Sequence, residues 1–347
     1  MAFKLPEFTV EIGGEVFGNE DIGYIKLTRS AAGLPVSGVI TAKLDFKLRT
    51  LVTFDSGAEV IVKRNGVQIL PVFYISRPDY GNGYAEITAY DMCRRLDMIF
   101  DTSGEFSEEK SYPVHSITAA IASQCGFSSA DGSDMNVGEI PYKLLYGRTC
   151  REILCTVSQC GCGMWHCRND GSLYFQRLET LGEMYTIKKG EYSEFRPGAK
   201  KGPIKCVSAY DQLTGNRFVS GSGDYLYTLK LSGKLMSQNI ADKILGSVGN
   251  YVYRGFRCGN IMTDSIPDAL CGFSFDGNVF RAVKQVTYFT PFGYLTDASA
   301  PNISEDRFDY IGAVSNELMN RIMQEKLYGG SMISYNGLKM VYREEEE

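Results

Sequence analysis

The stretch from Phe73 to Asp91 limits most strongly what this chain can fold into. Apolar and polar side chains alternate with a period of two on both sides of Pro78 to Gly83, and that central segment is rich in turn-forming residues. Alternation of this kind predicts two half-buried strands joined as a hairpin. Asp91 can then cap a short helix that runs to Ile99. We therefore expect a β-hairpin that leads directly into a helix.

The last five residues of this hairpin segment are similar to a second segment further along the chain. Ile87 to Asp91 reads Ile-Thr-Ala-Tyr-Asp, and Val207 to Asp211 reads Val-Ser-Ala-Tyr-Asp, so a like residue stands at each position. Repetition inside one chain hints at two related β units.

Short β-like runs separated by turns fill residues 9 to 89. Asn65-Gly66 is a strong hairpin turn because both residues accept the positive φ of a type I′ turn. Several short strands in succession predict a sandwich or barrel. The same patterning returns between residues 204 and 289, after a Gly-, Pro- and Lys-rich stretch at 196 to 203 that resembles a linker.

Helical patterns lie between these two β regions. One helix is expected to open at Pro113 and stop at Gly126. Another is expected from Thr149, whose hydroxyl can form a capping box with Glu152. Residues 96 to 200 therefore read as a small mixed α/β insertion.

The composition fits a folded protein of several domains. The chain has 347 residues, 44% of them hydrophobic, and its 22 tyrosines and 19 phenylalanines favour β structure. A formal net charge of −5 argues against a Lys/Arg surface for nucleic acid, so no specific nucleic-acid binding is expected. We expect no membrane segment, because no apolar run approaches the roughly 18 residues that one needs. Synthesis in the cytoplasm would keep the ten cysteines reduced.

Three segments together resemble one family, the baseplate hub proteins of phage tails and contractile injection particles, including the late-control-protein-like prophage tail hubs. They are Ile75 to Asp91, Ser111 to Gly126, and Thr149 to Phe175, the last with an Asp-Gly turn before an apolar strand. The resemblance implies a mainly β chain with an α+β insertion. It also implies a homotrimer that joins a sixfold tail tube to a threefold tip.

The resemblance also implies a domain order. A first tube-type β-barrel domain would span residues 1 to 95, the small α/β domain 96 to 200, a second tube-type β-barrel domain 201 to 300, and a C-terminal helix and hairpin 301 to 347. The implied partners are other copies of the chain, tail tube or distal tail proteins, a spike or tip protein, and the tape measure protein. Such a protein is made in the cytoplasm of a bacterial host and assembled into the virion tail or tail-like particle. Whether that tail contracts stays open.

The loop Asp55-Ser56-Gly57 offers an enzymatic alternative. It resembles the loop of retroviral-type aspartic peptidases, in which two carboxylates share one proton and activate a water. The same three residues also make an ordinary turn between strands, and we favour that interpretation. A hub module of a tail-associated lysin complex is a further alternative, disfavoured because no residues follow Glu347 to form a lytic domain. We expect no catalytic site and no cofactor.

One cysteine-rich segment is the only candidate metal site. Five cysteines lie between Cys150 and Cys167, together with His166, but their spacing lacks the paired Cys-x2-Cys units of structural zinc. We expect these cysteines to fill core space and to bind no metal, although the sequence leaves metal binding open. His115 and His166 are the only histidines, and neither stands beside a recognisable nucleophile.

The segment from Ser304 to Leu327 predicts the longest helix of the chain. Five apolar residues recur along one stripe of it: Phe308, Ile311, Val314, Leu318 and Ile322. A stripe of this length exceeds what the short tail behind it can cover, so we expect these residues to form an interface with another subunit or a partner. A hairpin around Asn336-Gly337 is expected after the helix.

Overall fold

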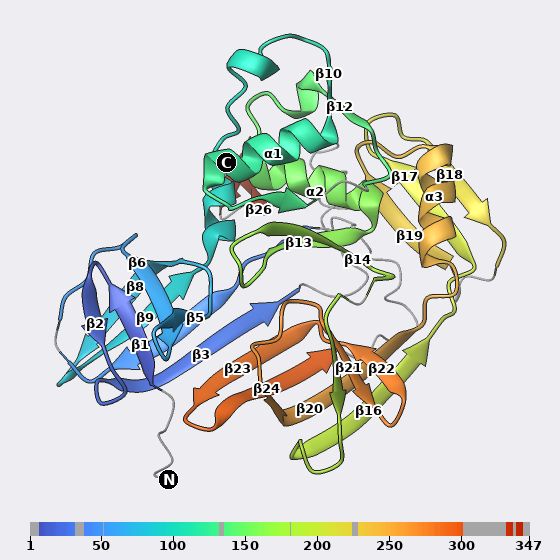
Figure 1. The fold of residues 1–347 in the computed structure, drawn as a ribbon. Coiled ribbons are helices and arrows are strands. Elements are labelled where there is room, and N and C mark those ends of the chain that lie inside the picture. The colour runs from blue at the N-terminus through green and yellow to red at the C-terminus, as the bar shows by residue number, and fades with distance from the viewer. Residues whose placement is uncertain are drawn as a thin grey trace, which may run out of the picture.

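The computed structural model describes residues 7–31, 38–50, 52–131, 135–180, 182–223, 228–300, 331–335 and 338–342. These residues form a mainly β protein. One long sheet of twelve strands runs through two β units, which come from different parts of the chain (Figure 1). An α/β unit and a smaller sheet with one helix pack beside them. Within the described part of the chain, no helix has the length and apolar character required to span a bilayer.

The first β unit comprises eight strands of the twelve-stranded sheet. They are β1 (Phe8–Ile12), β2 (Glu15–Phe17), β3 (Ile22–Ser30), β5 (Lys43–Leu48), β6 (Glu59–Arg64), β7 (Val67–Gln68), β8 (Phe73–Gly81) and β9 (Tyr84–Tyr90). Alternate residues of these strands enclose one apolar core, in which Leu44, Phe46 and Leu48 have no exposed surface. Strand alternation therefore explains why this segment folds as a sheet with one buried face.

The predicted hairpins of this unit are confirmed. β8 pairs antiparallel with β9 down to Gly81 and Tyr84, so the loop is only Asn82-Gly83, shorter than the predicted turn segment. The Asn65-Gly66 turn joins β6 to β7, and both residues have positive φ, as a type I′ turn requires.

The second β unit continues the same sheet. Four of its strands join the sheet, namely β16 (Glu194–Lys201), β20 (Tyr253–Thr263), β23 (Lys284–Thr290) and β24 (Gly293–Ala300). A three-stranded sheet packs against them, formed by β15 (Met184–Ile187), β21 (Gly272–Phe275) and β22 (Asn278–Arg281). Phenylalanine rings fill the space between the two layers, with Phe195 stacked on Phe275 at 4.4 Å between centroids.

The α/β unit lies between the two β units in the chain. Its helices are the 3-10 helices η1 (Met92–Asp97), η2 (Gly104–Phe106) and η3 (Tyr142–Leu144) and the α-helices α1 (Val114–Cys125) and α2 (Cys150–Gly161). Its strands are β4 (Gly38–Ile40), β10 (Ser111–Pro113), β11 (Ala130–Asp131), β12 (Glu139–Pro141), β13 (Gly163–Cys167) and β14 (Leu173–Arg177). The core of this unit surrounds Trp165, the only tryptophan, which has no exposed surface.

The local helix signals are confirmed with one difference. The predicted capping box between Thr149 and Glu152 begins α2, and Gly126 ends α1 with a φ of 85°. The helix after Asp91 is a 3-10 helix and ends at Asp97, earlier than the predicted Ile99. Asp91 caps it as predicted, because its side chain accepts a hydrogen bond from the backbone N–H of Cys93.

A separate three-stranded sheet interrupts the second β unit. It consists of β17 (Cys206–Asp211), β18 (Arg217–Gly221) and β19 (Thr228–Gly233), and α3 (Gln238–Val248) covers it. The repeated segment Val207 to Asp211 lies on β17, whereas its counterpart lies on β9 of the long sheet. The repeated pentamer therefore does not mark equivalent strands of two related β units, which corrects the interpretation drawn from the sequence. The domain boundaries at 95, 200 and 300 remain predictions.

The last described residues are β25 (Ser331–Tyr335) and β26 (Leu338–Tyr342), which pair antiparallel, as expected for a hairpin at this place. The predicted helix from Ser304 to Leu327 lies outside the described residues, and so do its five interface residues, Phe308, Ile311, Val314, Leu318 and Ile322.

Candidate functional site

The contact between the two β units is a continuous pair of strands. β23 pairs antiparallel with β3 in an unbroken register from Lys284 opposite Ser30 to Tyr288 opposite Lys26. Backbone hydrogen bonds of one sheet therefore cross from one unit into the other, and the two units form a single surface (Figure 1).

Each side of that contact has the same strand order. In the first unit the neighbours run β3-β5-β9-β8, and in the second they run β16-β20-β24-β23. Numbered along the chain within each set of four, both orders are first, second, fourth, third. The sheet therefore contains one four-stranded arrangement twice, with the third strand of the second set paired to the first strand of the first set.

Arg29 of β3 lies at the point where three parts of the chain meet. Its side chain is 3% exposed, and its guanidinium donates to the carbonyl of Pro267 and to Oδ1 of Asn169, the latter at 2.6 Å. It also approaches the carboxylate of Asp268 at 3.7 Å. Asn169 belongs to the turn between β13 and β14, and Pro267 and Asp268 lie between β20 and β21, so one arginine connects both β units and the α/β unit.

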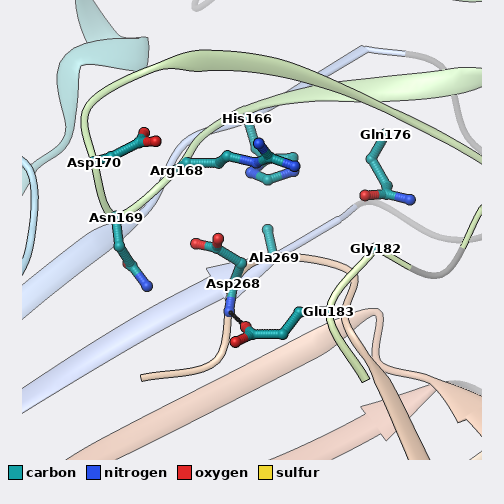
Figure 2. A pocket seen from close by; sticks show the side chains of 9 residues that line it. All are labelled: His166, Arg168, Asn169, Asp170, Gln176, Gly182, Glu183, Asp268 and Ala269. Carbon is teal, nitrogen blue, oxygen red and sulfur yellow. Dashed lines mark hydrogen bonds between the residues drawn. The ribbon is translucent and has the colours of Figure 1, made fainter. Parts of the chain in front are cut away.

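A polar pocket of about 280 Å³ adjoins Arg29. Figure 2 shows side chains from the β13–β14 hairpin facing two other segments, the loop between β20 and β21 that carries Asp268 and the residues before β15 that include Glu183. The residues that line it are His166, Arg168, Asn169, Asp170, Gln176, Gly182, Glu183, Asp268 and Ala269. The lining combines acidic, basic and amide groups and contains no serine, threonine or cysteine, so it offers no hydroxyl or thiol nucleophile.

His166 is the most deeply buried titratable group of this pocket. Burial, assisted by the charge of Arg29, lowers the pKa of His166 to about 3, so its ring is neutral at pH 7. Neither ring nitrogen has a hydrogen-bond partner within the described residues. Its ring meets Tyr174 edge-on, and Arg168 covers that tyrosine at 3.4 Å from the ring centroid. These contacts give His166 a packing role.

Asp55 lies where the turn interpretation places it. It is exposed, and its carbonyl accepts a hydrogen bond from Ala58 at 3.2 Å in the turn that precedes β6. Gly57 has a φ of 88°, a conformation that glycine adopts without strain. The geometry is that of a surface turn and gives the peptidase alternative no support.

Replacement of Asp55 by asparagine should change the free energy of unfolding by about 1 kcal/mol at most, because the side chain is exposed in a turn. Chemical denaturation of the two proteins measures this difference. Proteolysis that pepstatin inhibits and that this substitution abolishes would contradict the turn interpretation.

The cysteine-rich segment is divided between two cores. Cys150 and Cys167 belong to the core of the α/β unit, whereas Cys160 and Cys162 pack into the core shared by the second β unit and α3. All ten cysteines are free thiols, and no group of three or more His, Cys, Asp or Glu residues in the described ranges is arranged to hold a metal ion. His115 is exposed in the first turn of α1 and therefore does not resemble a buried catalytic base.

Sequence reasoning missed both Arg29 and the shared contact of β23 with β3. An arginine near the end of a strand carries no local signal of burial, because its partners are 140 and more residues away. Strand pairing over such a distance is likewise set by the assembled sheet and not by neighbouring residues.

No protein-family model and no curated protein sequence matches the chain. Solved structures do match. The 43 kDa tail protein of prophage MuSo2 from Shewanella oneidensis aligns with a TM-score of 0.55 at 14% identity, over 85% of this chain and 98% of that one. A tail protein from Neisseria meningitidis aligns with a TM-score of 0.56 at 12% identity, over 85% of this chain and 96% of that one.

A prophage tail protein, gp18 from Listeria monocytogenes, aligns with a TM-score of 0.53 at 12% identity, over 86% of this chain and 95% of that one. The alignments cover most of each chain, so the whole architecture is shared and not one unit alone. The chain has the fold of these phage tail proteins. The predicted mainly β fold and the resemblance to tail proteins are thereby confirmed at the level of the fold.

Proposed function

We propose that this chain is a non-enzymatic structural subunit of a phage tail or phage-tail-like particle. It acts as a baseplate hub that assembles as a homotrimer and adapts a sixfold tail tube to a threefold tip. The fold shared with three tail proteins, two of them from prophages, supports a place in a tail.

One observation carries the symmetry part of the proposal. The long sheet contains the same four-stranded order twice, in β3-β5-β9-β8 and in β16-β20-β24-β23. Three subunits then present six similar four-stranded units. A ring of six such units matches a sixfold tube on one side, while the remaining parts of the chain keep threefold symmetry on the other.

The proposed partners follow from that place. They are two further copies of the chain, tail tube or distal tail proteins, a spike or tip protein, and the tape measure protein. Synthesis takes place in the host bacterial cytoplasm, and the subunit ends in the virion tail or tail-like particle. No observation favours a second function, because Asp55 is a surface turn residue.

Native mass spectrometry of the purified chain tests the proposal. The expected species has three times the 38.5 kDa of one chain. A monomer or a dimer at all accessible concentrations would contradict the hub assignment. A dimer would favour the alternative of an aspartic peptidase that uses Asp55.

The apolar stripe predicted around Leu318 remains part of this proposal. Leu318→Asp places a charge within the expected interface, so we expect folded monomers that fail to form trimers. Asn316→Asp, off the stripe by the helical period, is the matched control and should assemble normally. Normal assembly of the Leu318→Asp variant, judged by size and electron microscopy, would assign the segment a passive role.

A further inference from the structure

The two outer edges of the repeated sheet fit each other, and this inference rests on the proposed trimeric ring. We propose that β8 of one subunit pairs antiparallel with β16 of the next subunit. The pairing joins the same two strand positions of the repeated arrangement that β23 and β3 join within one chain.

The internal contact defines which edges should meet. β23 is the third strand of its set of four and β3 is the first strand of the other set. By the same numbering, β8 is a third strand and β16 a first strand. Both third strands also enter a hairpin with a two-residue loop, since Gly81 pairs with Tyr84 and Thr290 with Gly293. The two sets are therefore equivalent in order and in hairpin geometry, and only one of the two possible contacts between them is made inside the chain.

Both edges have backbone available for pairing. β8 meets β6 only at Phe73 and Tyr74, so from Arg77 to Gly81 its described strand neighbour is β9 alone. From Glu194 to Pro197, β16 pairs with β20, and the described residues include no strand on its other side. The two edges lie at opposite sides of the molecule, as a head-to-tail contact requires (Figure 1).

The lengths of the two edges agree. A β-bulge interrupts β8 between Ile75 and Arg77, and another interrupts β16 between Pro197 and Lys200. The regular stretches that remain are Arg77 to Gly81 and Glu194 to Pro197. Antiparallel pairing of these two stretches places Gly81 opposite Glu194 and Pro78 opposite Pro197.

This register joins opposite charges. Asp79 comes to lie opposite Arg196. Both side chains are exposed in the single chain, by 62% and 73%, and each already forms an ion pair with a residue of its own strand. The register that copies the internal β23–β3 contact lies two residues away, with Arg77 opposite Arg196 and Asp79 opposite Glu194. It sets like charges directly against each other and is disfavoured. Charge therefore selects the register with Asp79 opposite Arg196.

The inward face of the same pairing joins two aromatic rings. Tyr80, 44% exposed in the single chain, comes to lie opposite Phe195. Phe195 borders a hollow of about 220 Å³ beside the β16 edge, lined also by Phe275 and Phe280. The phenylalanine rings give a tyrosine ring from the next subunit an apolar surface to cover, beside the polar and charged side chains that also line the hollow. Since Pro78 and Pro197 lack an N–H, the contact has few hydrogen bonds and depends on these side chains.

Paired cysteines test the contact directly. In the double variant Asp79→Cys with Arg196→Cys, the two introduced side chains face each other across the subunit boundary, and directly opposite residues are close enough for a disulfide. Mild air oxidation should convert most of the chain into covalent dimers and trimers on a non-reducing gel. Nine of the ten native cysteines are buried, which limits competing reactions.

The matched control moves the second cysteine from the edge strand β16 to its neighbour β20. Arg257 lies opposite Arg196 on β20, on the same face, so Asp79→Cys with Arg257→Cys adds roughly 5 Å and should give little cross-linking. Each single variant controls for pairing between identical positions.

A charge exchange provides a second readout that needs no disulfide. Asp79→Arg should raise the protein concentration needed for half-assembly by at least about tenfold, because it sets arginine against arginine at each boundary. Adding Arg196→Asp should restore assembly. Static light scattering over a dilution series measures both effects.

Two failures are distinguishable. The β8–β16 contact is wrong if the double-cysteine variant forms trimers but does not cross-link, and if the Asp79→Arg variant assembles at the same protein concentration as the unmodified chain. That result leaves the trimeric hub in place. An unmodified chain that never forms a trimer overturns the proposed function and the contact together.

Discussion

Replacement of Arg29 by methionine is expected to lower the free energy of unfolding by about 3–5 kcal/mol. The side chain is buried and connects Pro267, Asn169 and Asp268, which belong to two other parts of the fold. Methionine keeps much of the length but leaves the Pro267 carbonyl and the Asn169 side-chain oxygen without their donor and the Asp268 carboxylate without its neighbouring charge. Removal of one partner from a buried charged network costs more than the pair itself contributes.

Urea denaturation followed by tryptophan fluorescence measures this loss, because Trp165 is the only tryptophan and lies in the core of the α/β unit. Arg29→Lys keeps the charge but replaces the planar guanidinium and its several N–H donors by one ammonium group, so it should recover only part of the stability. Arg257→Met, at an exposed position of β20, is the matched control. A loss below about 1 kcal/mol in Arg29→Met would show that the junction does not depend on this side chain.

Replacement of Asp91 by asparagine is expected to change how stability depends on pH. Asp91 is 1% exposed, and its carboxylate accepts hydrogen bonds from the backbone N–H groups of Ala42 and Cys93 at 3.0 and 3.1 Å. Burial raises the pKa of Asp91 to about 7, although both hydrogen bonds and the charge of Arg29 oppose that rise.

The sign follows from proton linkage. In the unfolded chain the pKa of an aspartate is about 3.9, so between roughly pH 4 and pH 7 the folded state binds more protons at Asp91 than the unfolded state does. Its contribution to stability is therefore complete below about pH 4 and is lost as the pH rises through 7. Asparagine stays neutral throughout and removes this loss.

The difference in unfolding free energy, wild type minus Asp91→Asn, should accordingly fall by about 3–4 kcal/mol from pH 4 to pH 8. Urea titrations at several pH values measure it, and the subtraction cancels the contributions of the other carboxylates. A difference that stays constant or increases with pH would show that Asp91 is ionised in the folded protein across this range.

Local rules of sequence explain the parts of the fold that were predicted well. The β8–β9 hairpin, the Asn65-Gly66 turn, the Thr149 capping box and the Gly126 stop each depend on residues within a few positions of one another. Asp91 belongs to the same class, because a cap needs only the next two residues. These features were predictable since their partners are neighbours in the chain.

Features that depend on distant partners were not predictable in the same way. Pairing of β23 with β3 brings together residues more than 250 positions apart, and β4 leaves the first β unit to pair with β13. The repeated segment of five residues indicated two related units but did not identify equivalent strands, since β9 lies in the long sheet and β17 lies outside it. The repetition resides in strand order, which no short segment of sequence carries.

The central claim is that six equivalent four-stranded units, two from each of three chains, form one ring. A three-dimensional reconstruction of the purified assembly by electron cryo-microscopy tests it most directly. The account predicts a threefold particle in which β8 of each subunit continues into β16 of the next, so that the sheet closes with near-sixfold symmetry. A particle of any other symmetry, or a threefold particle whose two four-stranded sets lie at unrelated radii from the axis, would contradict it.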